Sequence, residues 1–166
     1  MTPAELLTDA FERIAQGGAQ VVDGLDEAAL TSRLRDGANT IAWLVWHLAR
    51  IQDDHVAEVA GLEQVWTAQG YADRFALPFD AADTGYGHTA EDVAAVRASA
   101  ADLAAYLRAT HEQTVGYLAG LDADGFDRVV DERWDPPVTL GVRLVSVLGD
   151  DWQHLGQAAY ARGLLT

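Results

Sequence analysis

The chain has 166 residues, 49% of them hydrophobic, and a formal net charge of −15, and all eleven of its basic residues are arginine. This length and apolar content predict one domain over residues 1–166 with a buried core. The acidity excludes a nucleic-acid or anionic-membrane partner, because little positive charge is available to neutralise phosphates. The absence of cysteine excludes disulfides, thiolate metal sites and a cysteine nucleophile. With no basic-then-apolar N-terminal pattern and no long apolar run, we expect a cytoplasmic protein.

Four long segments have apolar residues at helical spacing. The first predicted helix covers Pro3–Val22, and a proline suits its first turn. Gly17 and Gly18 weaken its second half by about 1 kcal/mol each relative to alanine. The second predicted helix covers Asn39–Ala60, with its asparagine as the N-cap and Gly61 as the residue that ends it.

The third predicted helix covers Thr89–Leu121. Its threonine can form a capping box with Asp92, and a break is expected near Ser99. The connection before it, Gly61–His88, is rich in glycine, aspartate and aromatic residues, with a short helix expected over Leu62–Ala68. A connection of this length in a small bundle is typical of a lid or a binding rim.

The fourth predicted helix covers Thr139–Arg162 and ends at Gly163. It follows the helix-breaking pair Pro136–Pro137, so the segment Asp131–Val138 is expected to be an extended loop. With no internal repeat, the four segments together predict an all-α four-helix bundle.

A polar stripe runs along the fourth predicted helix. Asp150 and His154 are four residues apart and therefore lie one turn above the other on one face. A carboxylate and a histidine at this spacing can supply two metal ligands, and a facing helix can complete the site. The second predicted helix offers His47 on its inward face. Two histidines and one carboxylate leave coordination positions open, as in catalytic zinc sites, and they also suit iron(II).

The same residues have simpler interpretations. Asp150 and His154 at this spacing also describe a surface pair worth roughly 0.2–0.5 kcal/mol, and His47 alone describes a hydrogen-bonded interior histidine. Four further polar residues could support the ligands or a substrate: Gln157, Arg143, Asp54 and Asp151. Each has an alternative as a solvated or salt-bridged side chain. For Arg143 the alternative partners are Asp131 and Asp135, just before the helix.

The segments TIAWLVWHLARIQDDH (40–55) and LVSVLGDDWQHLGQAAYARGLL (144–165) resemble the DinB/YfiT-like superfamily of four-helix bundles. The resemblance covers most of the chain. It is closest to an actinobacterial branch related to mycothiol-dependent maleylpyruvate isomerase and to bacillithiol and mycothiol S-transferases. Members bind a divalent metal through one histidine on the second helix and two ligands four apart on the fourth, which implies His47, Asp150 and His154. At the position of Asp150, relatives carry histidine or glutamate, and aspartate is one methylene group shorter than glutamate. Asp151 could take the place of Asp150 as a ligand if the helix were slightly rotated.

The resemblance further implies a low-molecular-weight thiol, such as mycothiol, that is held on the metal as a thiolate and attacks a small electrophile. The outcome is S-transfer, or isomerisation if the adduct collapses. We expect zinc, with nickel, iron or manganese as alternatives. Two other functions stay open. One is a non-catalytic metal- or ligand-binding bundle, for which the alternative includes a homodimer that covers the apolar surface of the first helix. The other is a metal-dependent hydrolase that uses zinc-bound water.

Overall fold

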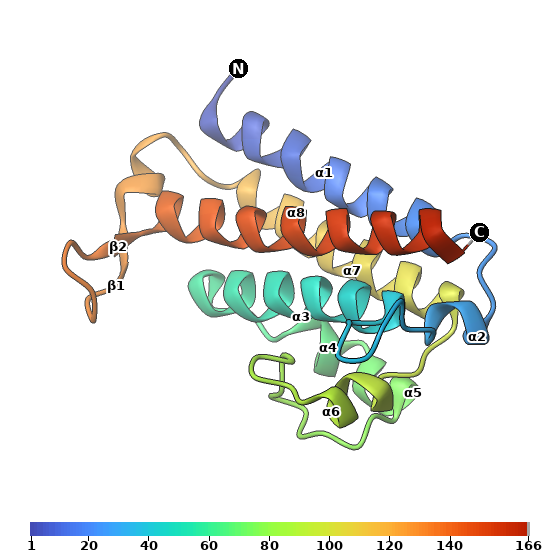
Figure 1. The fold of residues 1–166 in the computed structure, drawn as a ribbon. Helices are drawn as coiled ribbons and strands as arrows, with labels where there is room; N and C mark the ends of the chain where they lie inside the picture. Colours follow the sequence, from blue (N-terminus) through green and yellow to red (C-terminus); the bar gives the residue numbers. More distant parts are fainter. Residues whose placement is uncertain (166) are drawn as a thin grey trace.

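The computed structural model describes residues 1–165, and its four long helices form a bundle (Figure 1). They are α1 (Pro3–Val22), α3 (Ile41–Ala60), α7 (Ala100–Leu118) and α8 (Leu140–Leu165). Helix α3 packs against α7 and α8, and α1 packs against the same two helices. The predicted all-α four-helix bundle is therefore confirmed.

Short elements fill the connections between the long helices. They are α2 (Glu27–Leu30), α4 (Val65–Ala68), α5 (Tyr71–Phe75), α6 (Ala90–Ala95), the 3-10 helix η1 (Asp124–Asp127), β1 (Val129–Asp131) and β2 (Val138–Thr139). Helices α4, α5 and α6 lie on the side of α3 away from α1, and the β1–β2 hairpin projects at one end of the bundle (Figure 1). The two strands pair antiparallel, so only the middle of the predicted extended loop lacks regular structure.

Helix boundaries follow side-chain caps at most positions. The predicted capping box of Thr89 and Asp92 is present at the start of α6. The expected break near Ser99 is real, and the Ser99 side chain caps α7 by accepting from the Asp102 backbone. Asn39 was the wrong cap for α3, because the next residue, Thr40, accepts the backbone N–H of Trp43 instead.

Two further sequence expectations about helices were wrong or incomplete. Gly163 does not end α8, which continues to Leu165. An interior glycine costs a helix only about 1 kcal/mol, and Leu165 packs against the core, which favours continuing the helix past the glycine. The short helix expected over Leu62–Ala68 is confirmed only in its second half, and α5 was missed.

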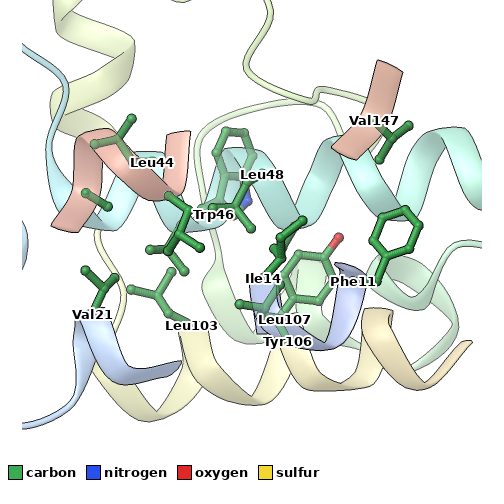
Figure 2. Close-up of a cluster of buried hydrophobic side chains, with 14 of the residues drawn as sticks. Phe11, Ile14, Val21, Leu44, Trp46, Leu48, Leu103, Tyr106, Leu107 and Val147 are labelled. Atoms are coloured by element: carbon green, nitrogen blue, oxygen red, sulfur yellow. The ribbon is translucent and has the colours of Figure 1, made fainter. Parts of the chain in front are cut away.

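The core lies where the four long helices meet. Figure 2 shows Phe11 and Ile14 of α1, Leu44 and Leu48 of α3, and the residues around them closing over one another. Helix α3 is the most deeply placed element, because its exposed residues are confined to its last turns. Across residues 1–165, no helix combines the length and the hydropathy that crossing a bilayer would need.

The two glycines of α1 allow its neighbours to approach closely. A Cβ built at Gly17 would lie 2.8 Å from Cδ2 of Leu155 on α8, and one built at Gly18 would overlap Leu107 of α7. The two glycines lower the helix propensity of α1, but they also let α7 and α8 pack tightly against it.

We expect Gly18→Ala to lower the free energy of unfolding by about 1–3 kcal/mol, because the added methyl group overpacks the buried Leu107. The matched control is Gly116→Ala on α7, where a Cβ would meet nothing within 4 Å. That variant should raise the free energy of unfolding by up to about 1 kcal/mol. Urea unfolding followed by circular dichroism measures both, and an equal effect of the two substitutions would contradict the proposed packing.

Candidate metal centre

The site forms where α3 and α8 pack antiparallel. His47, early on α3, lies beside the middle of α8, and His55, late on α3, lies beside Arg143 near the start of α8. Nε2 of His47 is 3.9 Å from Oδ2 of Asp150, and Nε2 of His154 is 3.6 Å from Oδ1 of Asp150. The three side chains that the sequence singled out thus converge at one point.

The geometry of this cluster fits a small divalent cation. One candidate ligand atom from each of the three side chains lies within 4.8 Å of the others. Ligand atoms about 2.0–2.2 Å from a tetrahedral ion are roughly 3.3–3.6 Å apart, so small side-chain movements would close the set. Oδ2 of Asp150 is buried without a hydrogen-bond partner. A buried carboxylate oxygen in that state is unfavourable unless something further binds it.

His47 is held firmly from the side opposite α8. Its Nδ1 lies 2.5 Å from the carbonyl oxygen of Thr84. A carbonyl can only accept, so Nδ1 carries the proton and Nε2 presents its lone pair towards Asp150. The ring also stacks on Trp43, with centroids 4.5 Å apart. Burial lowers the pKa of His47 despite the opposing effect of the Thr84 carbonyl, which favours the neutral form that ligates metals.

His154 is less constrained than His47. Its ring lies edge-on to His47 at a centroid distance of 4.7 Å, and its Nδ1 is buried with no hydrogen-bond partner. Burial acts to raise the pKa of Asp150, but the hydrogen bond and charge of His154 and the charge of His47 outweigh it and leave the pKa below its usual value. An ionised carboxylate therefore faces the two imidazoles.

Asp151 and Gln157 do not join the cluster. Asp151 is fully buried and neither of its oxygens has a hydrogen-bond partner. Burial raises the pKa of its carboxyl well above the usual range, and the charge of Asp150 adds to the shift. Gln157 is exposed on α8, and no hydrogen bond among residues 1–165 ties it to the ligands.

Asp54 and Arg143 belong to a separate polar hollow of about 640 Å³, between the end of α3 and the β1–β2 hairpin. Asp54 accepts a hydrogen bond from Gln64 at 2.7 Å. Arg143 pairs with Asp131 at 3.2 Å, which is the alternative that the sequence left open, and also donates to Nδ1 of His55 at 3.1 Å. Neither Asp54 nor Arg143 supports the cluster directly.

Sequence reasoning missed the residues that hold His47 from the loop. Thr84 contributes only its backbone carbonyl, which no side-chain pattern reveals. Gly85 follows it with a φ of +92°, and a Cβ there would lie 2.9 Å from both Nδ1 of His47 and the Trp46 ring. The glycine-rich GYGH sequence was the available signal, because glycine is needed where φ is positive or backbone approaches closely.

The comparisons with known proteins agree with this architecture. A family model for the DinB superfamily matches residues 10–158. The chain belongs to the DinB superfamily. A crystal structure of the conserved protein of locus from Enterococcus faecalis is similar to this DinB protein over 99% of this chain and 98% of its own, at 30% identity and a TM-score of 0.91. No curated protein matches the sequence, and the narrower resemblance to mycothiol-dependent enzymes stays a prediction.

The buried Asp151 makes the stability of this DinB protein depend on pH. Its folded-state pKa lies above its unfolded value, so between the two values the folded state binds more protons than the unfolded chain. The contribution of Asp151 to stability therefore falls as pH rises through that window. Asp151→Asn removes this titration.

We expect the free energy of unfolding of Asp151→Asn, relative to the original protein, to increase as pH rises from about 4 towards neutrality, with a slope of at most about 1.4 kcal/mol per pH unit. Urea titrations at a series of pH values, in the presence of a chelator, measure this difference. A difference that is flat across the range would show that the carboxyl is not held neutral.

Proposed function

We propose that this DinB protein is a divalent-metal-dependent thiol S-transferase or thiol-dependent isomerase acting on a small electrophile. The observation that carries the proposal is the convergence of His47, Asp150 and His154 within 4.8 Å at the contact of α3 and α8. The chain belongs to the DinB superfamily and its sequence resembles members that use a thiol. This resemblance supports a low-molecular-weight thiol as the cosubstrate.

The protein's own residues suit such a centre. His47 offers a neutral Nε2 whose orientation is set by Thr84, and Asp150 supplies negative charge to offset part of the charge of the cation. The side chain of Asp150 is 36% exposed, so the cluster can be reached from solvent. Three protein ligands leave room for a further one, the arrangement typical of catalytic rather than structural sites.

A bound divalent cation would supply one activity that the chain lacks: it lowers the pKa of a coordinating thiol so that the thiolate forms at neutral pH. The chain contains no cysteine, so the nucleophile must come from a cosubstrate. In the proposed reaction the thiolate sulfur adds to the electrophilic carbon of an activated double bond in the substrate. The π electrons of that bond move to the activating group, and the adduct then takes up a proton from solvent in place of the one that the thiol released. S-transfer ends there, and isomerisation follows if the carbon–sulfur bond breaks again after the substrate has changed geometry. We favour zinc for the donor set, and nickel, iron and manganese share it.

His154→Ala should weaken Zn²⁺ or Co²⁺ binding by at least about 100-fold, because it removes a ligand rather than one of the outer partners whose loss costs roughly 10–100-fold. The measurement is competition with a chromophoric chelator, on protein purified without a nickel column. The matched control, His55→Ala, removes a histidine of α3 that lies outside the cluster and should leave affinity unchanged. Equal metal content in all three proteins would refute the ligand set.

The thiol itself is tested with the Co²⁺-loaded protein. Adding mycothiol should produce a cobalt–thiolate charge-transfer band that saturates at millimolar thiol or below, and His154→Ala should lack it. If metal binds but no band forms, the thiol reading fails. Turnover of ester or amide substrates by the loaded protein would then favour a hydrolase, and no turnover would favour a metal-binding bundle.

A further inference from the structure

We propose that Arg50 is a positioning residue for His47 and acts through the loop of residues 81–88, which we call the strap. The strap connects α5 to α6 and carries Thr84, whose carbonyl accepts from Nδ1 of His47. The importance of this arrangement for metal affinity rests on the proposed function. The effect on the His47 ring does not, because it is a property of the protein without metal.

Arg50 is fully buried and its guanidinium binds the strap in a forked geometry. Nε donates to the carbonyl of Asp83 at 3.1 Å, and Nη2 donates to the carbonyl of Ala81 at 3.3 Å. Both acceptors lie within three residues of Thr84. A planar group with donors in fixed directions orients two carbonyls of one segment, which the single ammonium group of lysine cannot reproduce.

The guanidinium is itself fixed from the opposite side. Nη1 donates to the hydroxyl of Tyr106 at 3.2 Å, and Asp53 lies 3.6 Å away as the counter-charge. Asp53 accepts the backbone N–H groups of Val65 and Trp66 at the start of α4, each at 2.8 Å. Arg50 therefore connects the strap to α3, α4 and α7, and the residues that hold its guanidinium on these helices are buried.

The other end of the strap is tied to α3 as well. Nε2 of His88 donates to Oδ1 of Asp83 at 3.1 Å, and Nδ1 of His88 accepts from the indole N–H of Trp43 at 3.0 Å. The same Asp83 oxygen accepts the backbone N–H of Gly85 at 2.7 Å. Thr84 is thus held between contacts that precede and follow it, so the position of its carbonyl is set by its surroundings rather than by the loop alone.

The consequence concerns which nitrogen of His47 carries the proton. A free imidazole exchanges between two tautomers, and a fixed acceptor beside Nδ1 selects the one whose Nε2 is bare and faces Asp150. His154, whose Nδ1 has no partner, receives no such support. The strap, held by Arg50, therefore keeps His47 in the tautomer whose Nε2 is free to bind a metal.

The test compares Arg50→Lys with the original protein. In metal-free protein, at a pH above the range in which histidine titrates, the imidazole ¹⁵N NMR shifts of His47 report its tautomer. The His47 signal is assigned by its absence from His47→Gln. We expect a single Nδ1–H form in the original protein and a mixture of both tautomers in Arg50→Lys. Metal affinity should fall by about 10–100-fold, as it does for other outer partners of ligating histidines.

Two controls separate positioning from general loss of stability. Arg74→Lys changes an exposed arginine that pairs with Asp102 at the surface and should alter neither readout. Ile14→Val lowers stability in the core without touching the strap and should leave the tautomer unchanged. An unchanged His47 tautomer in folded Arg50→Lys would overturn the proposal, and so would a mixture in Ile14→Val.

If Arg50→Lys does not fold, Tyr106→Phe decides, because it removes the hydroxyl that accepts from Nη1 of Arg50 and that also donates to Oδ2 of Asp53 at 2.8 Å, so that Arg50 and its counter-charge both lose a partner. It should shift the tautomer in the same direction by a smaller fraction, and no shift would overturn the proposal. The two readouts separate the positioning role from the proposed function. If the original protein shows a single His47 tautomer but binds no metal, the positioning role stands and the proposed function is refuted. If the original protein binds metal but the variants keep the same tautomer, the positioning role is refuted and the proposed function stands.

Discussion

The antiparallel contact between α3 and α8 is the constraint on which the candidate site depends. Helix α3 is the most buried of the long helices, so a polar residue in its middle must find partners within the protein. His47 finds one in the strap carbonyl, to which Nδ1 donates, whereas its bare Nε2 faces the carboxylate of Asp150 at 3.9 Å without a hydrogen bond. A cation between the two groups would satisfy both. A shift of α8 by one turn, about 5.4 Å, would move Asp150 and His154 away from His47.

The three candidate ligands differ in how firmly they are held. His47 is stacked on Trp43 and bonded to a fixed backbone carbonyl, whereas His154 has an unsatisfied ring nitrogen and Asp150 an unsatisfied oxygen. If a cation binds here, the one rigid candidate ligand on α3 would fix its position, and the two less constrained ones on α8 would adjust to it. A preorganised ligand of this kind lowers the entropy that ordering the centre would otherwise cost.

Much of the site could be predicted from the sequence, because its ligands follow local spacing. Asp150 and His154 share a helix face whatever the rest of the fold, and the resemblance to DinB proteins identified His47 as the third member. The partner of Arg143 could not be predicted from the sequence. Whether its side chain reaches the candidate ligands or Asp131 depends on where the β1–β2 hairpin folds back. Asp54 was likewise left open between a supporting role and a solvated or paired side chain, and the fold places it beside Gln64 in a different hollow.

The errors have two physical origins, a competing local cap and tertiary contact. Asn39 and Gly163 carry the local signals of a helix end, and tertiary packing or a neighbouring cap overrode both. Thr84 and Arg50 carried no signal because their roles arise from contacts between segments far apart in the chain. Local patterns and the family resemblance therefore identified the candidate ligands, and only the folded chain showed which residues hold them in place.

Gly85 gives this arrangement an evolutionary consequence. Its positive φ and its contact with His47 and the Trp46 ring leave no room for a side chain. Any other residue there, or an insertion or deletion that displaced the glycine along the loop, would push the backbone off the imidazole. A homologous chain could thus keep all three candidate ligands and still lose the orientation of His47 through drift in a connecting loop. Inheritance of these three residues alone would therefore be an unreliable sign of a metal centre.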